Sequence, residues 1–150
     1  MSLVRFLLYS NELDVEGIVA TTSTWLRNAT AADQIRTVTD AYGEVLPNLN
    51  AHSQGYPAME EHLSKVRSGL PVYGLEGVGE GKDSEGSELL IEVVDKEDPK
   101  GRPVWVPVWG GANVLAQALW KVSNTRSYEE VKQFVSKLRV YSISDQVVKQ

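Results

Sequence analysis

The stretch VWVPVWGGANVLAQALW, residues 104–120, constrains the fold of this chain more than any other segment. Its first half is a short apolar run rich in Val and Trp, typical of a strand, and its second half is an apolar segment long enough for a helix. Gly110 and Gly111 separate the halves and predict a tight turn. We therefore expect a central strand, a polar elbow and a buried helix. Pro107 favours an edge or a bulge because it cannot donate to the ladder, but the apolar run around it favours burial on both faces.

Short apolar strands and helical patterns alternate along the rest of the chain. Residues 15–22 and 138–144 predict two more strands. Helices are expected at residues 2–11, from a capping box of Thr30 and Asp33 as far as Pro47, at residues 59–66, after Ser84, and after a capping box of Ser127 and Glu130. This alternation predicts an α/β fold with an open, mostly parallel, Rossmann-like sheet and helices on both faces.

The sheet is expected to be incomplete. Only three strands emerge from the sequence, whereas a typical sheet has ~4 to 6. A helix precedes the first strand and no helix follows the last one. We therefore expect the chain to be part of a larger α/β domain, or to complete its sheet by self-association through an unpaired edge.

Composition excludes several classes of function. The net charge is −5 and no run of Lys or Arg occurs, which argues against nucleic acid as a partner. No apolar run approaches the roughly 20 residues of a membrane-spanning helix. The chain has no Cys, which excludes disulfides and thiolate metal sites. No signal peptide is recognisable at the start, and both a secreted and a cytoplasmic location are compatible with the sequence.

Polar and aromatic residues follow the predicted strands, where parallel sheets bind their ligands. Hydroxyl, amide, carboxylate and indole groups would there share one rim, a mixture that suits the hydroxyls and apolar face of a sugar. For any one of these residues a structural role in a turn, a helix cap or the core is the commoner alternative. The candidates are Thr21, Thr22, Ser23, Trp25, Trp109, Asn113 and Asp145.

Five blocks of sequence together resemble one known family. In order, they are residues 2–25, 40–57, 73–92, 108–120 and 138–146. They are similar to the nucleoside hydrolase-like N-terminal domain of the cellulose-binding protein family found in fungi and bacteria. The resemblance implies a partial nucleoside hydrolase-like domain at residues 1–146 and a divergent tail at 147–150.

The resemblance also implies a chemistry. In the related nucleoside hydrolases a calcium ion, held by an aspartate cluster after the first strand, activates a water that cleaves an N-glycosidic bond. By this resemblance the Trp109 carbonyl corresponds to a calcium ligand, and residues 21–23 lie where the hydrolases place a substrate-contacting Asn. The family's first strand and acidic loop would precede Ser2, and after Gln146 the family continues with an acidic pair and a glycine that this chain lacks. By this resemblance both ends of the domain are expected to be truncated.

Three hypotheses follow. The first is a fragment of a calcium-dependent hydrolase of N-glycosyl, riboside-like compounds, inactive as this chain because Trp109 and Asp145 alone cannot supply the ~6 to 8 oxygen ligands of calcium. The second is a non-catalytic module that binds carbohydrate, such as cellulose, through Trp25, Trp109 and Tyr side chains. The third is a truncated product that folds poorly because its sheet lacks a strand. The ligand of a functional domain would be a small glycoside or a polysaccharide.

Overall fold

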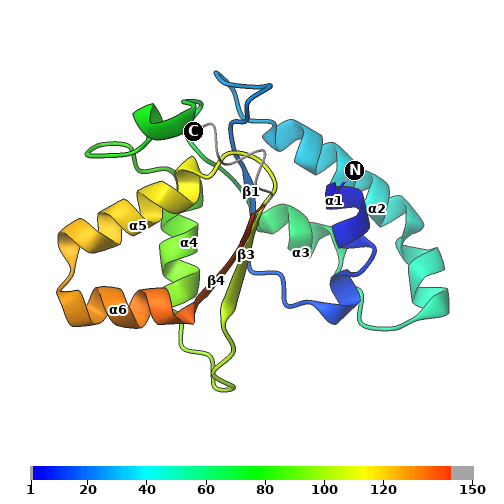
Figure 1. Cartoon of the computed structure of the whole chain (residues 1–150). Coiled ribbons are helices and arrows are strands. Elements are labelled where there is room, and N and C mark those ends of the chain that lie inside the picture. The colour runs from blue at the N-terminus through cyan, green and yellow to red at the C-terminus, as the bar shows by residue number, and fades with distance from the viewer. Residues whose placement is uncertain (1, 143–150) are drawn as a thin grey trace. The chain divides into compact units, whose positions relative to one another are not determined.

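The computed structural model describes residues 2–142 and divides the chain into two compact units (Figure 1). The first unit comprises residues 1–20 and 31–67, and the second comprises residues 21–30 and 68–150. Within the described part, no helix is both long and apolar enough to cross a membrane.

The first unit is mainly helical and contains one pair of short strands. Strand β1 (Ile18–Ala20) is hydrogen-bonded to β2 (Val66–Ser68), whose last residue opens the second unit. The other elements are α1 (Ser2–Leu7), the 3-10 turn η1 (Ser10–Glu12), α2 (Ala32–His52) and α3 (Met59–Ser64). Its core is built from the buried side chains of Leu7, Val15, Ile18, Tyr42 and Val66.

Two predictions for helix α2 are wrong. Helix α2 begins at Ala32, and Ala31 at its N-cap makes no side-chain cap, so the box of Thr30 and Asp33 does not form. The helix also continues past Pro47 to His52. Proline removes a single intrahelical hydrogen bond, and the apolar stripe of α2 packs on the core on both sides of it, at Val38 and Leu49.

Strand β2 was not foreseen from the sequence. Residues 59–66 were expected to form one helix, but α3 ends at Ser64. Val66 is buried in the core, and the Lys65 carbonyl before it accepts the N–H of Ile18 at 3.1 Å. Pairing with β1 therefore overrides a helical pattern that the local sequence alone favours.

The second unit has the mixed order of helices and strands expected of an α/β fold. Strand β3 (Val104–Val108) lies parallel to β4 (Leu138–Ser142), with Val104 opposite Leu138 and Val108 opposite Ser142. The helical elements are η2 (Gly74–Gly77), α4 (Glu85–Asp95), α5 (Asn113–Thr125) and α6 (Tyr128–Lys137). The capping box of Ser127 and Glu130 is present, and Ser84 caps α4 together with Ser87.

The sheet of β3 and β4 is covered on one face. Val104, Val106 and Leu138 pack into an apolar cluster with Val94, Val122 and Phe134 of the three helices. On the other face Trp105 is 66% exposed and Tyr141 is 60% exposed. The expectation that β3 is buried on both faces is therefore wrong, because the three helices pack only on the face that carries Val104 and Val106.

The parallel orientation expected of the sheet is confirmed for β3 and β4. The strands of the described residues form two two-stranded sheets, whereas a single sheet was expected. Among residues 2–142, β3 and β4 pair only with each other, so each has an edge without a partner strand. Self-association through such an edge stays a prediction.

A buried histidine marks the core of the first unit. His62 of α3 is fully buried, and within the described structure neither of its ring nitrogens has a hydrogen-bond partner. Its ring meets Tyr42 edge-on, with ring centroids 5.3 Å apart. Burial lowers the pKa of His62; nearby Lys65 acts in the same direction and Glu61 opposes it. The ring is therefore held in its neutral form.

We expect acid to destabilise the protein through His62. Below about pH 6.5, the ordinary pKa of histidine, the unfolded chain takes up a proton that the folded His62 does not. The free energy of unfolding should then fall by up to about 1.4 kcal/mol per pH unit from this residue. Urea unfolding between pH 7.5 and 5.5 measures the effect.

The substitution His62→Phe should remove this part of the pH dependence. His52→Phe, at the exposed end of α2, is the matched control and should keep it. An unchanged pH dependence in His62→Phe would show that another group is responsible.

Candidate functional site

The elbow between β3 and α5 is packed against the segment of residues 21–30. The N–H of Gly111 donates to the Thr22 carbonyl at 2.7 Å. A Cβ added at Gly110 would lie 2.8 Å from Thr21 Oγ1, closer than carbon and oxygen can approach without a shift. Any side chain at position 110 would therefore force the Thr21 hydroxyl or the backbone to shift.

Polar side chains from both segments converge on one backbone carbonyl. Val72 O accepts Thr22 Oγ1 at 3.3 Å and Asn113 Nδ2 at 3.0 Å. Thr22 is fully buried and Asn113 is 4% exposed. Both side chains therefore hold three stretches of chain together, and neither is open to a ligand. Asn113 Oδ1 is buried without a hydrogen-bond partner among the described residues.

Ser23 closes a tight turn that carries Trp25. The backbones of Ser23 and Leu26 exchange two hydrogen bonds, at 3.0 and 3.1 Å. The Ser23 hydroxyl also accepts the N–H of Trp25 at 3.3 Å and that of Leu26 at 3.1 Å. Trp25, at the tip of this turn, is 92% exposed. A turn fixed by four hydrogen bonds thus presents a large aromatic ring to solvent.

Tyr73 supports the turn from the glycine-rich segment. Its hydroxyl lies 3.1 Å from Thr24 Oγ1 in a hydrogen bond, and the Arg27 guanidinium stacks 4.9 Å from the centre of its ring. Arg27 Nε also donates to the Thr24 carbonyl at 3.3 Å. Tyr73 and Arg27 were not among the residues proposed from the sequence. The only signal for Tyr73 was an aromatic residue directly before a glycine-rich stretch.

The structure brings part of the predicted rim together. Thr21 and Thr22 lie beside the elbow, and Ser23 and Trp25 follow in the turn. Trp109 is half-buried where β3 ends. Asp145 lies outside the described residues. Asn113 is the first residue of α5 and does not cap it.

The described residues near the elbow do not fit a calcium ion. The carbonyl of Thr22 already accepts a hydrogen bond, and the side chains of Thr21, Thr22 and Asn113 carry no charge. Over residues 2–142 no group of three or more His, Cys, Asp or Glu side chains is placed to hold a metal. Calcium prefers ~6 to 8 oxygen ligands with several carboxylates, so the donor set is too small and too neutral.

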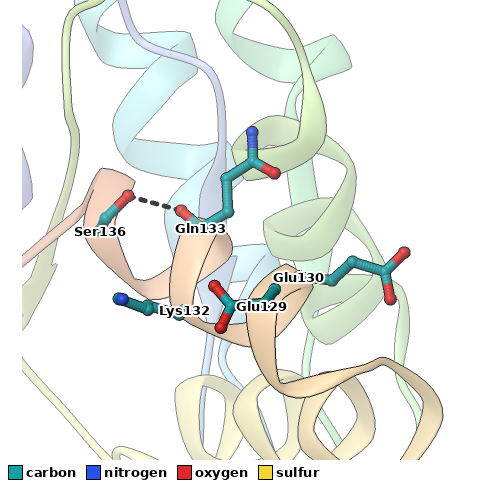
Figure 2. A pocket seen from close by; sticks show the side chains of 5 residues that line it. All are labelled: Glu129, Glu130, Lys132, Gln133 and Ser136. Carbon is teal, nitrogen blue, oxygen red and sulfur yellow. Dashed lines mark hydrogen bonds between the residues drawn. The ribbon is translucent and has the colours of Figure 1, made fainter.

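A shallow hollow on α6 offers no alternative site for a sugar. It measures about 400 Å³ and is lined by Glu129, Glu130, Lys132, Gln133 and Ser136 (Figure 2). None of these side chains is aromatic, and Glu130 is engaged in capping α6 through Ser127. The hydrogen bond from Ser136 to the Gln133 carbonyl, drawn in Figure 2, lies within the helix. The lining is a solvated helix face.

The sequence of the domain matches a known protein family. Residues 1–148 match the family described as "Cellulose-binding Sde182, nucleoside hydrolase-like domain". The chain belongs to this family. The resemblance stated from the sequence is thereby confirmed. No curated protein matches the chain.

A solved structure shares the fold of this family member. It is a nucleoside hydrolase-related hypothetical protein from Saccharophagus degradans that is associated with carbohydrate metabolism. The match has a TM-score of 0.90 at 46% identity and covers 97% of this chain, which confirms the α/β, nucleoside hydrolase-like fold class. The chain spans only 35% of the length of that protein.

The contact between Gly110 and Thr21 can be tested by substitution. Gly110→Ala should lower the free energy of unfolding by about 1 to 3 kcal/mol, the usual cost of overpacking. Removing the obstructing hydroxyl in Thr21→Ala should rescue part of that loss, so the double variant should be more stable than the sum of the single changes predicts. Urea unfolding of the four proteins measures the coupling. Strict additivity would contradict the close approach.

Proposed function

We propose that this domain binds a polysaccharide through Trp25 and does not itself hydrolyse N-glycosidic bonds. The observation that carries the proposal is the 92% exposed Trp25 on a turn fixed by four hydrogen bonds. Exposing a large aromatic side chain forgoes the free energy of its burial, and aromatic side chains are strongly enriched at binding sites. The apolar face of a pyranose ring is a natural partner for an indole face.

The family supports this choice of ligand. Its description includes cellulose binding, and the solved relative is associated with carbohydrate metabolism. In this chain the buried Thr22 and Asn113 serve to position the turn relative to the elbow. Pre-organisation of this kind reduces the entropy that a binding loop loses on contact with its ligand.

Replacing the indole should weaken retention on cellulose. Trp25→Ala should reduce the partition coefficient on insoluble cellulose by about thirtyfold or more, because truncating an aromatic anchor typically costs about 2 kcal/mol or more. A depletion assay with far-UV circular dichroism as a check of folding measures this.

The matched control for that assay is Tyr128→Ala. Tyr128 is 78% exposed but lies at the start of α6, and its removal should leave retention unchanged. Equal retention of the Trp25→Ala variant and the wild type would refute the role of Trp25. Equal losses in both variants would show adsorption without a defined site.

The competing function is calcium-dependent hydrolysis of N-glycosyl compounds, as in the hydrolases that the family resembles. It draws on the elbow, where the Trp109 carbonyl would be a ligand. Against it stands the absence of a cluster of carboxylates within residues 2–142. Metal-activated water needs an ion held firmly enough to lower the pKa of that water.

We therefore expect no turnover of ribosides by this chain. Incubation with p-nitrophenyl riboside, with and without added calcium, should release p-nitrophenol at the rate of the protein-free blank. The measurement is absorbance over hours at high protein concentration. Calcium-dependent release that saturates with substrate would establish the hydrolase instead.

A further inference from the structure

The shape of the protein surface around Trp25 limits the kind of ligand that can bind there. The turn is a short convex loop, and its backbone hydrogen bonds run between Ser23 and Leu26, directly below the tip. With 92% of Trp25 exposed, neighbouring side chains form no wall around the indole. Leu26 beside it is 39% exposed and adds apolar surface to the same turn.

Such a surface offers a small soluble saccharide too little contact area for tight binding. Sites for small ligands are concave and bury about 70 to 90% of the ligand. A single exposed ring can cover only one side of one sugar. A flat and extended ligand differs, because the same ring can contact many equivalent positions along it and rebinding at neighbouring positions raises the effective affinity.

The charges of the segment argue for an uncharged ligand. Residues 21–30 contain no acid and one base, Arg27. Its guanidinium already stacks on Tyr73 and its Nε donates to the Thr24 carbonyl. The chain as a whole carries a net charge of −5, which repels acidic polymers. Binding should then depend on contact between apolar faces and only weakly on salt.

We infer that Trp25 binds the flat surface of a neutral, insoluble glucan and does not capture soluble chains. The inference rests on the proposed function and specifies the ligand of the same site. Trp25 supplies the contact, Ser23 and Tyr73 fix its position, and the insoluble polymer supplies the contact area that the convex turn lacks.

Competition on insoluble cellulose tests the inference. The complete chain is bound to cellulose, and the bound fraction is measured with increasing cellohexaose as the soluble competitor, and separately with NaCl up to 1 M. We expect less than a twofold change in the partition coefficient in either series. Trp25→Ala should lower the partition coefficient by about thirtyfold or more, and Trp25→Phe, which keeps a ring on the turn, should recover part of it.

The outcomes separate the two claims. If cellohexaose displaces the wild-type protein stoichiometrically, the ligand is a soluble chain and this inference is wrong, although polysaccharide binding through Trp25 stands. If NaCl releases the protein, the adsorption is electrostatic and the inference is likewise wrong. If the wild-type protein is not retained on cellulose at all, both the inference and the proposed function fail.

Discussion

One backbone carbonyl, that of Val72, joins three segments of the second unit. It accepts hydrogen bonds from the hydroxyl of Thr22 and the amide of Asn113, which come from segments far apart in the sequence. Both donors are buried, so losing the acceptor would leave two unsatisfied polar groups in the interior. Each such group costs about 1 to 3 kcal/mol. This node fixes residues 21–30 against the elbow.

The node explains why polar residues stand at the elbow of an otherwise apolar strand and helix. Thr22 and Asn113 make internal hydrogen bonds, Gly110 leaves room for the Thr21 hydroxyl, and Gly111 donates its N–H to the Thr22 carbonyl. What remains available to a partner is the part of the segment beyond the node, the turn of Ser23 to Leu26 with Trp25 at its tip. This nucleoside hydrolase-like domain thus presents an exposed aromatic side chain on the turn next to the elbow.

The sequence predicted the elements whose pattern is local. The strand, elbow and helix of residues 104–120 and the capping box of Ser127 follow from periodicity and turn residues. The parallel orientation of β3 and β4 follows from the alternation of strands and helices. The acceptor at Val72 could not be predicted, because a backbone carbonyl has no signature in the sequence and lies 50 residues from Thr22. Strand β2 was missed since three residues are too few to establish a period of two. The exposure of Trp105 was missed because a continuous apolar run does not reveal whether one face of a strand or both faces are buried.

Residue-resolved contact with the polymer tests the central claim most directly. The chain has four Trp residues, so four indole N–H resonances are expected in a ¹⁵N spectrum, and Trp25→Phe assigns one of them. On addition of suspended cellulose, the resonance of Trp25 should broaden selectively through exchange with the bound state. Those of Trp109 and Trp120, both half-buried, should keep their line widths. Selective broadening of Trp105 on the exposed face of β3, with Trp25 unaffected, would contradict the account.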